Sequence, residues 1–336
     1  MLKLKIYIVA DYREQFQSFI DGDVNFNPHP GKSNIIEVKQ AITSKGIECD
    51  YYGGIYELLN ACNNKHQFSK ETLFFNMSDG LTQSYCRLQA PVLLNLLGVK
   101  YTGSSPFAVA LMNNKHYTKL AIKSNEVNIP SGFMIDKGEV INEDQFASLK
   151  YPLIIKPNND GFSIGITSES VVHDYNQAIN QISLLFNDFD EIIVEEYISG
   201  IDASVFLIGN KNIFSVNEVI AYKTHGKFHQ EYSVRDVHTK ANKLSEKYTG
   251  DAIFTKSTIQ KVKKISIDIF NDVHAYDIAR IDYRIKENGE IYFIEANACP
   301  ILSPQSDVAV VCNNMGITYP DFIELYYETA LSRYTN

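Results

Sequence analysis

The chain has 336 residues, of which 45% are hydrophobic and 21% charged, enough for two or three packed subdomains. Its net charge of −9 argues against a general nucleic-acid-binding protein, and five cysteines without a C-x-x-C pair favour neither a disulfide framework nor a structural zinc site. No apolar run reaches the roughly 18 residues that cross a bilayer, and charge follows the start too closely for a signal peptide, so we expect a cytoplasmic protein without nucleic-acid or membrane partners.

The first hundred residues alternate short apolar runs with helical patterns. Strands are predicted at 4–10, 47–53 and 72–78. Helices are predicted at 33–46 and 85–98, and each ends at a glycine. This alternation predicts an α/β layer with a largely parallel sheet.

The next part of the chain changes pattern. A helix is predicted over 106–125, followed by a linker, NIPSGFMI, that leads into a new strand. From residue 150 the apolar runs come in pairs, which predicts hairpins and an antiparallel sheet. The pairs are YPLIIKP (151–157) with SIGITS (163–168), and EIIVEEYI (191–198) with ASVFLIG (203–209).

Residues 222–251 are polar and weakly periodic, and a connection of that length is usually a functional loop or lid. A helix predicted over 256–275 separates this segment from a final hairpin. His225 and His229 lie four residues apart in the loop, but no glutamate follows His225. Solvated loop histidines therefore explain them better than a zinc-protease motif.

The segment ARIDYRIKENGEIYFIEAN predicts a hairpin with a two-residue turn at Asn288-Gly289. Such a turn places Asp282 opposite Glu295. It also places Arg280 opposite Asn297, with all four side chains on one face. Opposed carboxylates repel, so a shared proton, a salt bridge to Arg280 or a divalent cation must offset their charge. Two carboxylates and an amide suit Mg²⁺, although a structural charge cluster explains the pattern equally well.

A second polar stretch, IIKPNNDGFSIGIT, places a glycine-rich loop after a strand that ends at Lys156. Backbone amides around Gly161 and Gly165, together with the Ser163 hydroxyl, can cover phosphate groups, and Lys156 can neutralise their charge. A plain polar hairpin turn explains the same pattern. The loop is not a Walker A motif, which requires G-x-x-x-x-G-K-[ST] before a helix.

Together these segments resemble the ATP-grasp ligases, and within them the D-alanine–D-alanine ligase family. The resemblance covers most of the chain and is strongest in YPLIIKPNNDGFSIGI, IIVEEYISGIDASV and ARIDYRIKENGEIYFIEANACP. It implies a mixed α/β and α+β protein, an ATP-grasp fold with an amino-terminal parallel α/β (Rossmann-like) subdomain. The implied divisions are an amino-terminal domain at 1–104, a small ATP-grasp subdomain at 105–198, and a large carboxy-terminal subdomain with the metal site at 199–336.

The resemblance implies an ATP site. Lys115 and Lys156 would contact the phosphates, and Glu195 would accept a hydrogen bond from the adenine amino group, beside the Ile198 backbone. Asp202 stands where the family has a ribose-binding acid, usually glutamate. The implied nucleotide-binding residues are Lys115, Lys156, Gly161, Ser163, Glu195, Glu196, Tyr197, Ile198 and Asp202.

The resemblance also implies chemistry on the acidic face. Asp282, Glu295 and Asn297 would hold two Mg²⁺ ions, with Mn²⁺ as an alternative, which answers the like-charge crowding. Arg280 would stabilise an oxyanion, and Lys240 in the polar loop would contact the γ-phosphate. The implied catalytic residues are Arg280, Lys156 and Lys240.

Departures from the family pattern concern the substrates. The family usually reads N-x-x-P-G after the metal strand, whereas Ile301 occupies the glycine position here. Ser306 matches a serine that holds the second substrate's carboxylate, but Asp307 replaces the usual leucine, and its charge would repel a carboxylate. No glutamate stands where dipeptide ligases hold the first substrate's amine. The expected substrate-binding residues are Arg280, Ile301 and Ser306.

These features predict an ATP-dependent carboxylate–amine ligase that forms an amide bond through an acyl phosphate and releases ADP and phosphate. Its substrates would be an amino acid or other carboxylate plus an amine, and the resemblance suggests a homodimer. One alternative is a true D-alanine–D-alanine ligase with unusual substrate contacts. Another is a nucleotide-binding pseudoenzyme, against which the retention of Lys156, Asp282, Glu295 and Asn297 argues.

Overall fold

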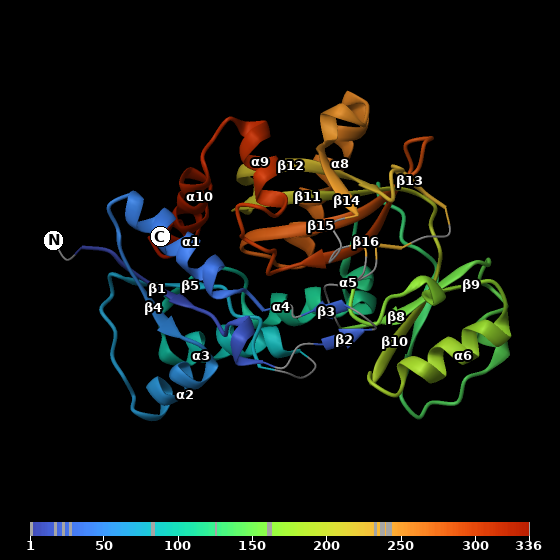
Figure 1. Ribbon diagram of the computed structural model, residues 1–336, viewed down its shortest axis with the longest axis horizontal. Coiled ribbons are helices and arrows are strands. Elements are labelled where there is room, and N and C mark those ends of the chain that lie inside the picture. The colour runs from blue at the N-terminus through green and yellow to red at the C-terminus, as the bar shows by residue number, and fades with distance from the viewer. Residues whose placement is uncertain are drawn as a thin grey trace.

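The computed structural model describes residues 3–335 apart from 17–18, 22–23, 27–28, 82–84, 125, 160–162, 232–233, 236–238 and 240–243. Three main sheets follow one another along the described chain (Figure 1). The N-terminal sheet lies at the left of that view and the small sheet at the lower right, with the large sheet above and between them. A parallel sheet followed by two antiparallel sheets confirms the predicted α/β and α+β class.

The N-terminal part builds the predicted parallel α/β layer. Its elements are β1 (Lys5–Val9), β2 (Phe19–Asp21), β3 (Val24–Phe26), α1 (Lys32–Ser44), β4 (Glu48–Gly53), α2 (Ile55–Asn63), β5 (Thr72–Asn76), α3 (Gln89–Leu97) and β6 (Lys100–Tyr101). The sheet order is β4-β1-β5-β6, and β2 and β3 form a separate ribbon. Gly98 adopts a φ of +65° directly after α3, a left-handed conformation that ends helices and that glycine reaches without steric cost.

The predicted helix over 106–125 is two helices, α4 (Pro106–Asn113) and α5 (Lys115–Ala121). Asn114 breaks the pattern because its backbone is extended and its side chain accepts a hydrogen bond of 2.9 Å from the Tyr117 amide. Buried residues of α4 join the core of the large sheet rather than that of the small one. The subdomain boundaries after residues 104 and 198 stay a proposal.

The small sheet has the order β7-β10-β8-β9 and is antiparallel throughout. Its strands are β7 (Gly132–Asp136), β8 (Leu153–Pro157), β9 (Val171–Val172) and β10 (Glu191–Glu196), and α6 (Tyr175–Leu185) packs on them. The predicted strand SIGITS is wrong. Ser163 and Gly165 have φ values of +67° and +72°, which interrupt extended backbone, and β9 pairs with β8 instead.

The large sheet has the order β14-β12-β11-β15-β16, with β13 beside β11. Its strands are β11 (Gly200–Asn210), β12 (Ile213–Thr224), β13 (His229–Gln230), β14 (Ser245–Thr249), β15 (Asp277–Ile285) and β16 (Ile291–Asn297). The predicted hairpin between 191–198 and 203–209 is wrong, because β10 and β11 belong to different sheets. Gly200, with a φ of +143°, lies where the chain passes between them, and a Cβ there would meet the Ile285 carbonyl oxygen at 2.6 Å.

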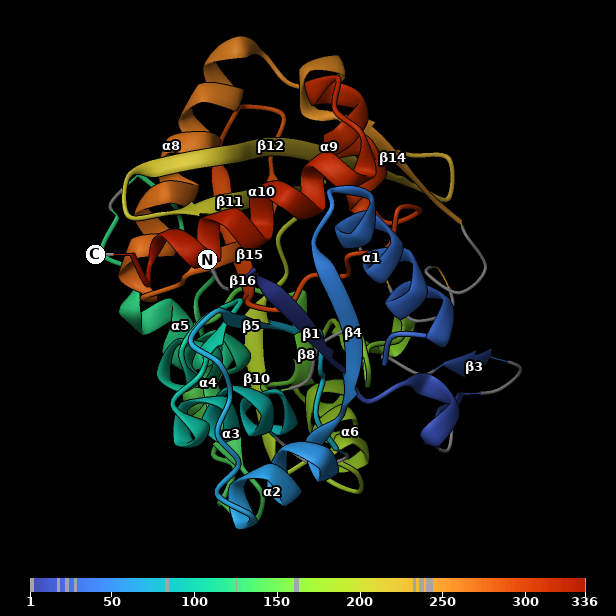
Figure 2. The same cartoon turned by 90° about the vertical axis from the view of Figure 1, so that its left-hand side faces the viewer.

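Helices cover both faces of the large sheet. One face shares a core with α9 (Asp307–Met315), α10 (Tyr319–Ser332) and the N-terminal α1, whereas the other packs against α8 (Lys256–Asp272) and α4. Figure 2 shows α10 between α1 and the strands of this sheet. Among the described residues, no helix has both the length and the apolar character to cross a bilayer. Short 3₁₀ helices occur at Arg13–Gln15, Cys86–Leu88, Glu143–Gln145, Ser168–Ser170 and Gly250–Ala252.

Candidate active site

The final hairpin brings two carboxylates face to face. Asp282 on β15 lies opposite Glu295 on β16, and Arg280 lies opposite Asn297, as the sequence predicts. Ser204, on the neighbouring strand β11, pairs with Asp282 from the other side. The predicted acidic face therefore exists on the large sheet.

The turn of this hairpin differs from the prediction. Ile285 pairs with Ile291, so the five residues between them form the loop instead of a two-residue turn at Asn288-Gly289. By itself, a five-residue loop would place each residue of β15 opposite the residue one position earlier on β16 than the two-residue turn predicts. A bulge at Ile294, the extra residue between the partners of Tyr283 and Asp282, restores the predicted pairing beyond it.

Asp282 carries the first of the two facing charges, and Arg280 offsets it. Arg280 donates from Nε and Nη2 to the two carboxylate oxygens of Asp282, at 2.8 and 2.7 Å. The Ser204 hydroxyl donates to the same carboxylate at 2.7 Å. Burial lowers the pKa of Arg280, but Asp282, Tyr222 and Asp307 together outweigh it and hold that pKa well above its ordinary value.

Glu295 carries the second charge and faces Lys115 at the start of α5. The Lys115 Nζ lies 3.7 Å from a Glu295 oxygen and donates to the carbonyls of Pro157 and Asn158 at 3.3 and 3.4 Å. Lys115 therefore joins the end of the small-sheet strand β8 to the acidic face. Asn297 points its amide oxygen at the Cys299 amide, with a hydrogen bond of 2.9 Å.

These residues fit a divalent cation in part. Among the described residues, no group of three or more His, Cys, Asp or Glu side chains is arranged to hold a metal ion. Asp282 and Glu295 face each other with side chains 19% and 27% exposed. A carboxylate offers about four lone-pair sites, and Asp282 uses three of them for Arg280 and Ser204. Hard oxygen donors of this kind suit Mg²⁺ when a bound ligand's phosphates complete its octahedron.

Glu195, on β10 of the small sheet, is the counter-ion of two lysines. Its side chain is buried, one oxygen lies 3.0 Å from the Lys156 Nζ, and the other bonds to the Lys119 Nζ. An adenine amino group would have to share this carboxylate with both lysines. The sequence reasoning missed Lys119, although its spacing of four residues from Lys115 places both on one side of α5.

Lys156 has an altered pKa. Burial, and then the neighbouring Lys115, lower the pKa of Lys156 to about 8. Lys156 is therefore charged below this pH and loses its charge as the pH rises through it.

We expect the association constant of ATP to fall above pH about 8, as isothermal titration calorimetry at successive pH values would show. Lys156→Arg should keep its affinity to higher pH, and a wild-type affinity that stays flat from pH 7 to 9.5 would contradict this assignment.

One pocket of about 760 Å³, including its open mouth, brings together seven of the predicted site residues. Its described lining includes five cationic and three acidic side chains, a balance that attracts a polyanion such as a nucleotide triphosphate. Of the predicted set, the pocket is lined by Lys115, Lys156, Ser163, Asp202, Arg280, Asp282 and Glu295. Arg235 and Arg284 complete the cations. Arg235 belongs, with Lys240, to the basic residues of the polar loop that the resemblance places near the γ-phosphate, whereas no site role was predicted for Arg284.

The other predicted nucleotide residues lie at the pocket's edge or outside it. Asp202 forms an ion pair of 3.0 Å with Arg284, which also donates to the Tyr197 hydroxyl at 3.2 Å. Glu196 accepts a hydrogen bond from the Lys150 amide at 3.0 Å, and Ile198 is half-buried. Gly161 and Lys240 lie outside the described residues.

Known proteins match this fold and this region. The family model described as "D-ala D-ala ligase C-terminus" matches residues 123–326. The D-alanine–D-alanine ligase of Aquifex aeolicus is 27% identical over 234 residues, 69% of this chain and 74% of that protein. A Bacillus anthracis D-alanine–D-alanine ligase in complex with ATP superposes with a TM-score of 0.70 at 17% identity over 98% of each chain. The Enterococcus faecalis VanG D-Ala:D-Ser ligase gives 0.71 at 17% identity, over 98% of this chain and 100% of that one.

The chain belongs to the D-alanine–D-alanine ligase family. This membership confirms the predicted resemblance and the predicted class, an ATP-grasp ligase that forms carbon–nitrogen bonds. The final hairpin, which carries the acidic face, lies within the residues that the family model matches. The individual roles of Lys115, Lys156, Asp282 and Glu295 stay predictions.

Two of the three residues expected to bind substrates in this D-alanine–D-alanine ligase relative, Ile301 and Ser306, lie after β16. Ile301 is 47% exposed and lines a second pocket beside the N-terminal domain. Ser306 caps α9, accepting a hydrogen bond from the Val308 amide at 3.3 Å, and its hydroxyl donates to the Ser303 carbonyl at 2.6 Å. Ser306 is therefore engaged in local structure, in contrast to Ile301.

Asp307 differs from the expectation that its charge would repel a carboxylate. Its side chain is buried, with Lys247 at 3.2 Å, Arg280 at 3.4 Å and the Tyr222 hydroxyl at 3.1 Å. Burial raises the pKa of Asp307, but Arg280 and Lys247 outweigh it and hold that pKa below its ordinary value. The negative charge is thus compensated by two cations, so a carboxylate substrate stays compatible with this family member.

Proposed function

We propose that this protein is an ATP-dependent carboxylate–amine ligase that forms an amide bond through an acyl phosphate and releases ADP and phosphate. The observation that carries the proposal is the pair Asp282 and Glu295, which face each other across a hairpin in a pocket whose lining includes five cations. Family membership and the activities named for its relatives support it. A charge cluster that served stability alone would not need five cations around an open pocket.

The nucleotide would lie between the small and large sheets. Lys115 and Lys156 would contact its phosphates, since both line the pocket. Glu195 would lie at the adenine end and Asp202 at the ribose, as the resemblance implies. Arg235 is a further phosphate candidate, because it lines the pocket and its carbonyl accepts a hydrogen bond of 2.7 Å from Ser163.

Asp282, Glu295 and Asn297 would hold Mg²⁺, with Mn²⁺ as an alternative. The bound cation supplies charge neutralisation for the transferring phosphoryl group and its bridging oxygen. Asn297 contributes through its amide oxygen, which keeps one lone pair after the Cys299 hydrogen bond.

The reaction then proceeds in two displacements. A carboxylate oxygen of the donor attacks the γ-phosphorus of ATP, the bond to the β–γ bridging oxygen breaks, and ADP leaves. The unprotonated amine of the acceptor attacks the carbonyl carbon of this acyl phosphate, phosphate leaves, and the amine proton passes to solvent. Arg280 uses three of its five N–H groups on Asp282 and Asp307, so two remain for the oxyanion that develops on the carbonyl oxygen.

The second pocket would hold the body of the donor. It lies between the N-terminal domain and the segment after β16, lined in part by Arg13, Asn76, Ile278, Pro300 and Ile301. Ile278 and Arg280 are both on β15 at alternate positions, so a donor held there can direct its carboxylate toward Arg280. Its described lining holds no glutamate, and its carboxylate is Asp79, which pairs with Arg87 at 2.8 Å.

An incubation with ATP, Mg²⁺ and a pool of amino acids, other carboxylates and amines tests the proposal. We expect ADP to accumulate, together with a product whose mass equals donor plus acceptor minus water. A requirement for D-alanine alone would identify a true D-alanine–D-alanine ligase. ATP binding without ADP under any pool would favour the pseudoenzyme, and absence of both binding and ADP would refute the proposal.

The family resemblance adds two further parts to this proposal, a homodimer and a cytoplasmic location. Sedimentation velocity of the purified protein tests the dimer, since a single species with the mass of one chain at micromolar concentration would exclude it. Fractionation of the native cells tests the location.

A further inference from the structure

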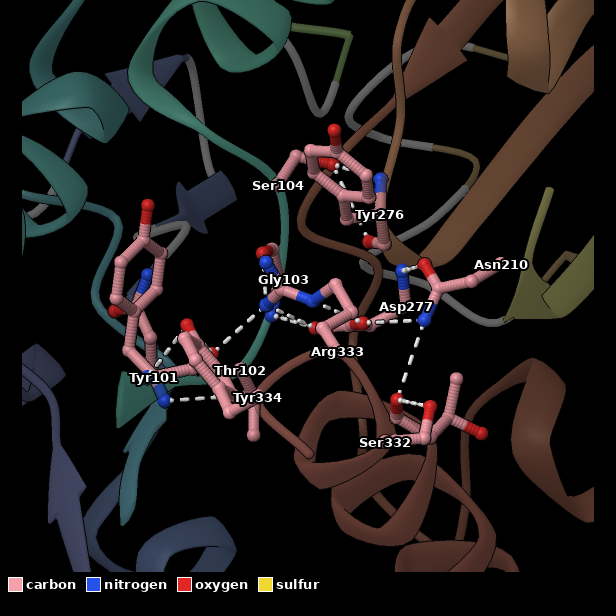
Figure 3. A network of polar contacts seen from close by, with 12 residues as sticks. Tyr101, Thr102, Gly103, Ser104, Asn210, Tyr276, Asp277, Ser332, Arg333 and Tyr334 are labelled. Carbon is pink, nitrogen blue, oxygen red and sulfur yellow. Dashed lines mark hydrogen bonds and ion pairs between the residues drawn. The ribbon is translucent and has the colours of Figure 1, made fainter. Parts of the chain in front are cut away.

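Residues from three distant parts of the chain meet at the start of β15. Figure 3 shows Arg333, directly after α10, reaching Asp277, the first residue of β15, beside the segment 101–104 that leaves the N-terminal domain. The Arg333 guanidinium donates from Nε and Nη2 to the two oxygens of Asp277, at 2.8 and 2.7 Å. Such a planar two-point contact fixes direction as well as distance.

The same pair also holds the linker segment. The Gly103 amide donates to Asp277 at 2.8 Å, and Arg333 donates to the carbonyls of Tyr101 and Gly103 at 2.9 and 3.2 Å. Tyr334 adds two contacts of 3.1 Å between its hydroxyl and the backbone of Tyr101. The last described residues of the chain therefore tie the N-terminal domain to the large sheet.

Asp277 is fully buried and its backbone is unusual. Its φ of +64° is left-handed, which costs a residue with a side chain about 1 kcal/mol or more, so the surrounding contacts must stabilise it. Asn210 donates to its carboxylate at 3.0 Å and accepts from its amide at 3.0 Å. The direction in which β15 leaves this point is thus set by side chains from outside the strand.

That direction matters for both pockets. The residue after Asp277, Ile278, lines the second pocket, and Arg280 and Asp282 further along the strand line the nucleotide pocket. A change in how β15 begins would move the two pockets relative to each other. Transfer between two bound substrates is sensitive to such movement, since a misplacement of about 1 Å can cost about 100-fold in rate.

We propose that Arg333 and Asp277 are a positioning pair, which aligns the donor recess with the nucleotide pocket by fixing the start of β15 against the segment 101–104. The inference rests on the proposed ligase function for its kinetic consequence. Its structural consequence does not depend on that function. When the pair is broken, the backbone amides at 101–104 and 276–280 should lose protection from hydrogen exchange.

The kinetic test compares Arg333→Met with Arg333→Lys and with Ile323→Val. Ile323 is fully buried on α10, the helix that precedes Arg333, so its truncation lowers stability without touching the pair. We expect Arg333→Met to lower kcat for ADP release by about tenfold or more while the Kd of Mg-ATP changes less than about twofold. Arg333→Lys should restore part of kcat, and Ile323→Val should leave kcat at the wild-type value.

A double variant tests whether the two residues act together. Asp277→Asn combined with Arg333→Met should lower kcat no more than Arg333→Met alone, because partners in one interaction are not additive. If the double variant lowered kcat by the product of the two single-variant factors, the two residues would not act as a pair. Equal kcat in Arg333→Met and Ile323→Val would also overturn the proposal, because it would assign Arg333 a merely structural role.

Hydrogen-exchange mass spectrometry separates this inference from the proposed function. In Arg333→Met, faster exchange is expected at 101–104 and 276–280, with α6 of the small sheet unchanged as the internal control. If the wild type forms no ADP, the proposed function fails and this measurement still decides the positioning pair. Unchanged exchange at both segments would refute it.

Discussion

Glu295→Gln lowers the rate of ADP formation by about 100- to 1,000-fold and leaves the protein folded. The change keeps the size of the side chain but removes the charge that faces Asp282 across the hairpin and lies 3.7 Å from Lys115. A glutamine holds a divalent cation weakly, and loss of about 3–4 kcal/mol of charge stabilisation in the transition state corresponds to this factor. Steady-state kinetics with varied Mg²⁺ measures it, and the Mg²⁺ concentration for half-maximal rate should rise.

A matched control lies on the same hairpin. Glu287 is in the loop between β15 and β16, and its side chain is 80% exposed. Glu287→Gln removes the same charge from the same element but far along the strands from Asp282, so its rate should equal that of the wild type. If both variants keep wild-type rates, the acidic face has no part in catalysis.

Lys119→Met destabilises the protein by about 1.5–3 kcal/mol, the usual contribution of a hydrogen bond to a charged group, because Lys156 still pairs with Glu195. Lys119 and Glu195 have side chains only 6% and 3% exposed, so the carboxylate left behind cannot regain water. Lys156 stays as its remaining counter-ion at 3.0 Å, and it is then drawn toward Glu195 and away from the phosphates. Urea unfolding measures the stability, and calorimetry should show a weaker association with ATP.

Two further variants make this prediction specific. Lys264→Met removes a lysine of the exposed pair with Glu126, and its unfolding free energy should match the wild type because surface pairs contribute little. Lys119→Met combined with Glu195→Gln should be less stable than Lys119→Met alone, since the buried Lys156 then loses its carboxylate partner. A single variant as stable as the Lys264→Met control would show that Lys119 is not a structural partner of Glu195.

The sequence predicts individual elements of this fold better than their partners. The parallel N-terminal layer follows from apolar runs separated by glycine-ended helices, and the structure has those elements. The runs 191–198 and 203–209 also contain strands, but they lie in separate sheets. Sequence proximity suggested a hairpin, whereas the pairing depends on packing that local pattern does not encode. SIGITS fails for a different reason, because positive φ values at Ser163 and Gly165 replace extended backbone.

The candidate site shows the same limit. Opposition of Asp282 and Glu295 follows from the period of two along each strand, and the structure confirms it. The link between Lys119 and Glu195 joins residues 76 positions apart, and only the packing of α5 against the small sheet brings them together. Asp307 looks like an unpaired charge in the sequence, because Arg280 and Lys247 come from strands far from it in the chain.

The bulge at Ile294 makes the tip of the final hairpin independent of its base. Pairing of β15 with β11 from Asp277 to Ile285 fixes the strand without help from the loop, and the bulge absorbs the offset that the loop introduces. Residues added between Asn288 and Gly289 should therefore leave Glu295 in register. The tip is therefore an insertion point where an affinity tag or a fluorophore can be carried without displacing the acidic face.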